Sequence, residues 1–223
     1  MSAREAILGK LRMAINVEAD DTARASVVAS RLKRAPKGVI PERGQLDLAE
    51  RAKLFCAMAE RLSATVERVK SEDAIPRAVA SYLRQHNLPA SFRMGADRRL
   101  AGLPWDKQRA LQLKSGASDG DDEVGVSHAT AAIAETGTLL LTSGKANPST
   151  INFLPEHHVV VVDAADIEGD LEAALGKVRK AEGKGHMPRT VNLISGPSRS
   201  ADIEQKLVLG AHGPRALHII VVG

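Results

Sequence analysis

Cysteine and aromatic residues are scarce in this chain of 223 residues, which contains one cysteine, Cys56, and 2% aromatic residues. A single cysteine cannot form an internal disulfide, and it cannot supply the four thiolates that an iron–sulfur cluster normally takes. Cys56 lies in a helical pattern of apolar residues, which favours packing over reactivity. The few aromatic side chains provide little surface for stacking single-stranded bases, so nucleic acid is an unfavourable partner.

Long apolar runs are also missing. No stretch approaches the length needed to span a bilayer, and the N-terminal residues Met-Ser-Ala-Arg-Glu lack the apolar core of a signal peptide. Hydrophobic residues make up 43% and charged residues 26%, which is a globular composition, and the formal charge of +4 permits anionic partners without demanding them. We therefore expect a cytoplasmic, soluble protein with no membrane span.

Several cofactor motifs are absent. No Gly-x-Gly-x-x-Gly follows a predicted strand, and the pair Gly144-Lys145 lacks the flanking residues of a phosphate-binding loop. His157 and His158 are adjacent, so in a strand they point to opposite faces and cannot share a metal ion. The acidic run 119–123 lacks the spacing of a calcium loop. The sequence therefore predicts no metal site.

The chain divides into an N-terminal arm, residues 1–44, and a main domain, residues 45–223. Ala3 to Ile15 has the spacing of an amphipathic helix. The polar, basic stretch that follows, up to Gly44, is typical of a solvated connector, with a docking surface for a partner as the alternative.

The main domain alternates between helical and strand patterns. Helices are expected over 47–62, 71–83 and 166–181, and strands over 64–69, 90–94, 190–195 and 218–222. This alternation predicts an α/β fold with a mostly parallel sheet flanked by helices.

A predicted turn lies between two short apolar runs, Ala131–Ala134 and Thr138–Leu141. Gly137 can supply the positive φ of a tight strand-to-strand turn. The turn then presents Glu135 and Thr136 at the end of a sheet, where rigid strands suit ligand contact. A solvated polar turn is the equally weighted alternative.

A serine-rich loop, Gly196–Glu204, follows the predicted strand 190–195. Loops after parallel strands are where α/β sheets bind ligands, so Ser198, Arg199 and Ser200 could cradle an anion there.

An equally weighted alternative for this loop is structural. Ser200 then caps a short helix, and Arg199 pairs with Asp202 or Glu204.

Four segments together resemble one known family. They are Ala134-Glu-Thr-Gly-Thr-Leu, Leu154-Pro-Glu-His-His-Val, Gly196-Pro-Ser-Arg-Ser-Ala-Asp-Ile-Glu, and Gly210-Ala-His-Gly-Pro followed by Leu217-His-Ile-Ile-Val. In this order they are similar to the lactate utilisation protein C family, whose shared unit is the LUD domain, from about residue 46 onward. Ala211 stands where the family often has valine. The resemblance implies a fold related to ribose-5-phosphate isomerases, glucosamine-6-phosphate deaminases and coenzyme A transferases. It also implies a role beside two iron–sulfur proteins in oxidising L-lactate to pyruvate.

The resemblance and the residues together lead to a hypothesis. Lactate oxidation removes two electrons, and the chain shows no cysteine set, dinucleotide fingerprint or flavin motif that could accept them. We therefore expect a non-redox subunit without a cofactor of its own, with iron–sulfur clusters on partner proteins. A crevice in this subunit would bind a small anionic ligand or a partner segment. Its expected residues are Glu135, Thr136, Gly137, Thr138, Ser198, Arg199 and Asp202.

Within this crevice, Arg199 would pair with a carboxylate and a threonine hydroxyl would donate to it. Glu135 could act as a base, although a nearby Arg199 would lower its pKa. Two other functions remain open: a stand-alone isomerase or coenzyme A transferase-like enzyme that uses Glu135, and a regulatory or assembly protein whose arm docks elsewhere. A homo-oligomer is compatible with all three.

Overall fold

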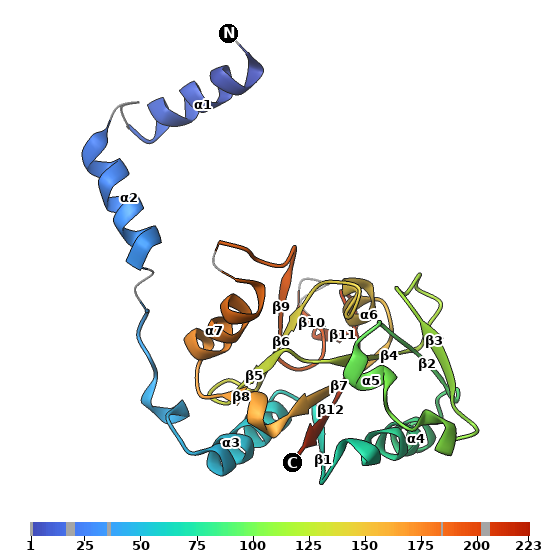
Figure 1. Cartoon of the computed structure of the whole chain (residues 1–223). Helices are drawn as coiled ribbons and strands as arrows, with labels where there is room; N and C mark the ends of the chain where they lie inside the picture. Colours follow the sequence, from blue (N-terminus) through green and yellow to red (C-terminus); the bar gives the residue numbers. More distant parts are fainter. Residues whose placement is uncertain (1, 17–20, 35–36, 184, 202–205) are drawn as a thin grey trace. The chain divides into compact units, whose positions relative to one another are not determined.

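The computed structural model describes residues 2–16, 21–34, 37–183, 185–201 and 206–223. The chain forms two compact units, Met1–Val39 and Ile40–Gly223. The first contains α1 (Ala3–Ala14) and α2 (Thr22–Arg34) (Figure 1). The predicted first helix is confirmed, and Ser2 and Glu5 close its N-terminus as a capping box. The α2 helix falls within the stretch predicted as a connector, and none of its residues is buried.

The second unit, which we call the body, carries the remaining elements. Its helices are η1 (Glu42–Gly44), α3 (Leu48–Arg61), η2 (Glu72–Ala74), α4 (Ile75–Gln85), α5 (Arg98–Ala101), η3 (Trp105–Lys107), α6 (Ser149–Phe153), η4 (Ala164–Asp166) and α7 (Leu171–Glu182). Its strands are β1 (Thr65–Val69), β2 (Ser91–Met94), β3 (Gln112–Ser115), β4 (Val124–His128), β5 (Ala131–Ile133), β6 (Thr138–Thr142), β7 (His157–Asp163), β8 (Ile167–Glu168), β9 (Val191–Ile194), β10 (Arg199–Ser200), β11 (Val208–Leu209) and β12 (Ala216–Val222).

The main sheet has six parallel strands in the order β1-β12-β7-β4-β2-β3. The central strands β7 and β12 are almost continuous apolar runs, as expected for strands that are covered on both faces. The predicted α/β class with a mostly parallel sheet is confirmed.

A second sheet has the order β8-β5-β6-β9, in which β5 pairs antiparallel with β6 and β6 pairs antiparallel with β9. The prediction that strand 190–195 belongs to a parallel sheet is wrong, because β9 pairs antiparallel with β6, with Leu139 opposite Ile194. The short pattern Val-Asn-Leu-Ile predicts a strand but carries no information about its neighbour.

Three apolar clusters lie between the layers of helices and strands of the body. One face of the main sheet packs against α4, with Phe92, Val126 and Val161 in the shared core. The opposite face packs against α3 and the second sheet, with Phe55 and Leu139 in that core. The α7 helix covers the outer face of the second sheet. The main sheet therefore lies between α4 on one face and α3 with the second sheet on the other, and α7 covers the outer face of the second sheet.

Two boundaries differ from those expected. The helix predicted to start at Asp166 begins at Leu171, because Asp170 caps it by accepting from the backbone N–H of Ala173. Residues 40–44 belong to the body rather than to the arm. Gly44 packs against Gly169 so closely that a Cβ on Gly44 would lie 2.1 Å from the Gly169 carbonyl oxygen.

Candidate functional site

The predicted turn between β5 and β6 is present, and Gly137 has a φ of 65°. A Cβ at this position would lie 2.5 Å from the backbone nitrogen of Ala59 in α3, so both the backbone conformation and the close packing require glycine.

Glu135 lies on this turn and is buried, with 6% of its surface exposed. Its backbone N–H donates to the Gly169 carbonyl, and its carboxylate lies 3.7 Å from Nε of Arg43. The cationic partner of Glu135 is therefore Arg43 and not Arg199.

Thr136 and Thr138 form a chain of hydroxyl groups with Ser195. The Thr136 and Thr138 hydroxyls are 2.7 Å apart, and the Thr138 and Ser195 hydroxyls are also 2.7 Å apart. This chain joins the turn to the end of β9, so the structure does bring the two predicted segments together at that point.

Part of the serine-rich loop forms a short strand. Arg199 and Ser200 make up β10, which pairs antiparallel with β11, and the segment that Ser200 was predicted to cap lies mostly outside the described residues. The Arg199 guanidinium donates to the carbonyl of Leu62 at the end of α3. Asp202 lies outside the described residues.

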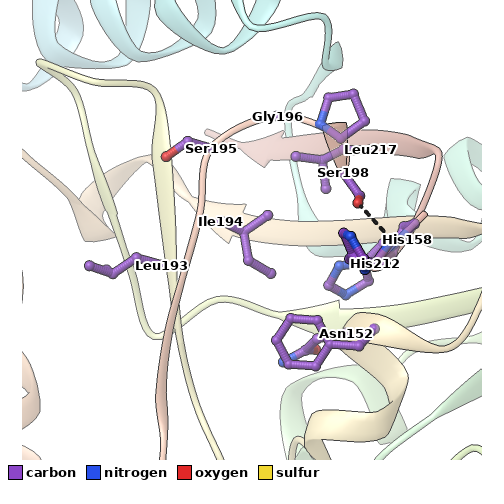
Figure 2. A pocket seen from close by; sticks show the side chains of 13 residues that line it. Asn152, His158, Leu193, Ile194, Ser195, Gly196, Ser198, His212 and Leu217 are labelled. Atoms are coloured by element: carbon purple, nitrogen blue, oxygen red, sulfur yellow. Dashed lines mark hydrogen bonds between the residues drawn. The ribbon is translucent and has the colours of Figure 1, made fainter. Parts of the chain in front are cut away.

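A cavity of about 230 Å³ lies beside this loop (Figure 2). It is lined by Asn152, Phe153, His158, Leu193, Ile194, Ser195, Gly196, Pro197, Ser198, His212, Gly213, Pro214 and Leu217. Of the predicted site residues, Ser198 lines it directly, whereas Thr136 and Thr138 reach it only through Ser195. Glu135, Gly137 and Arg199 are not part of its lining.

The cavity lies at other strand ends than those at which the sequence predicted a site. His158 and Leu217 are the second residues of β7 and β12, so the cavity lies at the amino ends of these parallel strands. The predicted site lay at the carboxyl end of a parallel strand, whereas β9 is antiparallel to β6.

A polar chain crosses one wall of the cavity. Nε2 of His158 lies 3.0 Å from the hydroxyl of Ser127, and this hydroxyl donates to Oδ1 of Asn152 at 3.2 Å. A hydroxyl has one proton, so Ser127 must accept from Nε2–H of His158, and Nδ1 of His158 is left unprotonated.

Two atoms of the polar chain formed by His158, Ser127 and Asn152 have no hydrogen-bond partner. They are Nδ1 of His158 and Nδ2 of Asn152, and the two residues are 0% and 1% exposed. Burial lowers the pKa of His158 to about 3, so its imidazole is neutral near pH 7. Both atoms are buried within the protein beside the cavity, an acceptor on His158 and a donor on Asn152.

Packing holds these groups in place. Gly125 of β4 lies beneath α6, and a Cβ there would be 2.7 Å from the carbonyl oxygen of Ile151. The missing side chain lets α6 approach the sheet closely enough for Asn152 to meet Ser127.

At the mouth of the cavity, the Ser198 hydroxyl accepts from the backbone N–H of His212 at 3.3 Å and retains its own proton for donation. In Figure 2 the Ser195 hydroxyl points away from Asn152 and His158, in keeping with its bond to Thr138. Ser198 therefore supplies a further neutral donor beside the cavity.

Sequence reasoning missed Ser127, Asn152 and His158, because it tested the adjacent histidines only as metal ligands. A signal was available. Three of the four segments that carried the family resemblance, those beginning at Leu154, Gly196 and Gly210, contribute residues to the lining.

The carboxyl edge of the main sheet holds a second polar group. Asp97 pairs with Arg99 at 2.9 Å, and Nε2 of His128 lies 3.5 Å from the Asp163 carboxylate. Hydrogen bonding to His128 lowers the pKa of Asp163 despite partial burial. Each of these four side chains has a charged or polar partner, and none lines the cavity.

The sequence was compared with models of known protein families. The model of the LUD domain matches residues 52–222. The chain belongs to the LUD domain family. Among the described residues of this LUD protein, no group of three His, Cys, Asp or Glu side chains could hold a metal ion, and no helix has the length and apolar character needed to cross a membrane.

Curated relatives of this LUD protein include two named Lactate utilization protein C. The protein from Shouchella clausii is 33% identical over 118 residues, which is 52% of this chain and 51% of the relative. The protein from a Geobacillus species is 38% identical over 100 residues, 44% of this chain and 42% of the relative. The chain thus spans about half the length of the curated relatives it matches.

A solved structure has the same fold. It is the crystal structure of a DUF162 family protein from Deinococcus radiodurans, which is 21% identical and superposes with a TM-score of 0.59. The superposition covers 80% of this chain and 99% of the other, so it extends over nearly all of that protein.

Proposed function

We propose that this LUD protein is a non-redox subunit of a system that oxidises L-lactate to pyruvate, with iron–sulfur clusters on partner proteins and a small carboxylate bound in the cavity. The observation that carries the proposal is membership of the LUD family together with relatives named for lactate utilisation.

The cysteine content supports placing the redox centres on partners. Cys56 is the one cysteine of the chain, whereas a cluster normally takes four thiolates. Partial burial also raises the pKa of the Cys56 thiol, which disfavours the thiolate that would act as a ligand or nucleophile.

The lining of the cavity supports a small ligand of low charge. Among the described residues it contains no lysine or arginine side chain, so a doubly charged phosphate group would be desolvated without a compensating cation. A volume of about 230 Å³ suits a small organic acid better than a coenzyme A thioester.

The exposed apolar residues of the N-terminal unit support a role within an assembly. On α1, Ile7 and Leu11 are 60% and 53% exposed, and on α2 Leu32 is 78% exposed. Apolar side chains grouped on amphipathic helices are typical of surfaces that dock onto other proteins.

Reconstitution tests the proposal. The two iron–sulfur partner proteins are mixed with L-lactate and an artificial electron acceptor, with this chain or with an unrelated protein at the same concentration. We expect acceptor reduction to depend on this chain. Equal reduction in the two mixtures would remove the subunit role.

A further inference from the structure

A second cavity lies beside the C-terminal end of α4. Its volume is about 330 Å³, which is enough for a small organic ligand. Its lining comes from the last turns of α4, from the segment that leads into β2, and from residues 107–111 between η3 and β3. The lining shares no residue with that of the cavity beside the serine-rich loop, so the two are separate sites.

Backbone hydrogen bonds fix the walls of the second cavity. At the end of α4, the Leu88 N–H donates to the Leu83 carbonyl at 2.9 Å. On the other wall, the Leu111 N–H donates to the Gln108 carbonyl at 2.8 Å. The two walls continue into β2 and β3, which pair with each other in the main sheet. The cavity is therefore built by the fold and needs no ligand to form.

Three cationic side chains line the second cavity, those of Arg84, Lys107 and Arg109. The lining, all of which belongs to the described residues, contains no carboxylate, and Asp106 of η3 is not part of it. None of the three cations forms an ion pair with a described carboxylate. A cavity lined by charges of one sign concentrates ions of the opposite sign.

The second cavity also offers apolar surface. Leu83 is 2% exposed, and Leu88 and Leu111 pack against the core between α4 and the main sheet. The three cationic side chains are exposed, whereas the leucines are buried or partly buried. The positive charge therefore lies at the mouth of the cavity, and the apolar surface lies deeper.

From this arrangement we infer that the second cavity binds an organic phosphate, with its phosphate group at the three cations and an apolar group against the leucines. A phosphate monoester carries about 1.5 to 2 negative charges near pH 7, so it balances more of the positive charge than one carboxylate does. The planar fork of an arginine fits two phosphate oxygens, and a lysine adds a point charge.

The inference goes beyond the proposed function. The cavity assigned there to a small carboxylate has no lysine or arginine among the described residues of its lining. The second cavity has three cations, so it suits a different and more highly charged ligand.

Calorimetric titration of the full-length chain with three probes tests the class of ligand. Phenyl phosphate carries both a phosphate group and an apolar ring, inorganic phosphate lacks the ring, and benzoate keeps the ring with a single negative charge. We expect phenyl phosphate to bind about tenfold more tightly than either of the others, because the ring and the additional charge each contribute to binding. Affinity for inorganic phosphate or benzoate equal to that for phenyl phosphate, or no binding of phenyl phosphate, would overturn the inference.

Two charge-matched double variants locate the site. Lys107→Gln with Arg109→Gln removes two cations of the lining, and Lys70→Gln with Arg77→Gln removes a lysine and an arginine outside it. All four side chains are exposed, so neither double variant disturbs the core. We expect the first to lose about tenfold in affinity for phenyl phosphate and the second to keep wild-type affinity. Equal affinities of the two double variants would show that only net charge matters and would contradict the inference.

Discussion

The adjacent histidines His157 and His158 lie on opposite faces of strand β7 and have different surroundings. On the face toward α4, Nδ1 of His157 is 2.8 Å from the Tyr82 hydroxyl, and the Tyr82 ring stacks on His218 with centroids 4.4 Å apart. We call Tyr82, His86, His157 and His218 the tyrosine–histidine cluster. On the other face, Nε2 of His158 is bonded to Ser127, and its Nδ1 is buried without a hydrogen-bond partner.

The two neighbouring imidazoles therefore lie in different surroundings, His157 in a cluster of rings and His158 beside a cavity. Successive side chains of a strand point to opposite faces, so one step along the sequence moves an imidazole from a packed cluster to a cavity wall. In the tyrosine–histidine cluster the rings fill space and bond to each other or to Thr65. His158 is held by one hydrogen bond, to Ser127, and in both His158 and His218 the other ring nitrogen is buried without a hydrogen-bond partner.

The largest expected effect is a loss of stability in acid to which both faces contribute. Burial lowers the pKa of His158 to about 3 and that of His218 to about 4, from an ordinary value of 6.5. The unfolded chain therefore binds protons below pH 6.5 that the folded chain does not, so stability is present above pH 6.5 and lost as pH falls. Between pH 6.5 and 5 each histidine should cost about 2 kcal/mol.

Denaturant unfolding at pH 7 and pH 5 measures this loss. Replacing either histidine by an uncharged residue, His158→Leu or His218→Phe, should remove that residue's share of the pH dependence. A free energy of unfolding that does not change between the two pH values in the wild-type chain would show that neither face keeps its histidine neutral.

Gly125→Ala should have a smaller effect, confined to the cavity face. The added Cβ would meet the Ile151 carbonyl at 2.7 Å and push α6 away from β4. Overpacking of this kind costs about 1–3 kcal/mol, and the displaced Asn152 should also weaken L-lactate binding. Gly176→Ala is the matched control, because it lies in α7 with no atom within 4 Å of the added Cβ. The control should stabilise the chain by about 0.5–1 kcal/mol, and a similar gain in Gly125→Ala would refute the packing argument.

Tyr82→Phe should have the smallest effect, confined to the tyrosine–histidine cluster. The substitution removes the hydroxyl that bonds to His157 but keeps the ring that stacks on His218. We expect a loss of about 1 kcal/mol in the free energy of unfolding with no change in L-lactate affinity. Calorimetric titration of the variant checks the second point, and weakened binding would mean that the two faces are coupled.

Much of the fold follows from local pattern in the sequence. The alternation of helix 47–62, strand 64–69, helix 71–83 and strand 90–94 predicts the α/β class, because amphipathic spacing and β-branched runs are local properties. The turn at Gly137 was likewise predictable from one glycine between two apolar runs.

The site was less predictable, because its contacts join distant parts of the chain. Ser127 and His158 are 31 residues apart and meet only through the pairing of β4 with β7. The antiparallel pairing of β9 with β6 moved the expected site from the carboxyl ends of parallel strands to the amino ends of β7 and β12. No local pattern encodes either arrangement.

The most direct test of the account is nitrogen NMR of the chain with ¹⁵N-labelled histidine side chains, recorded with and without L-lactate. His158→Leu and His157→Leu assign the two neighbouring rings. We expect L-lactate bound in the cavity to shift the ring nitrogen resonances of His158, which lines the cavity, and to leave those of His157 and His218 unchanged. A shift at His157 or His218 with none at His158 would contradict it.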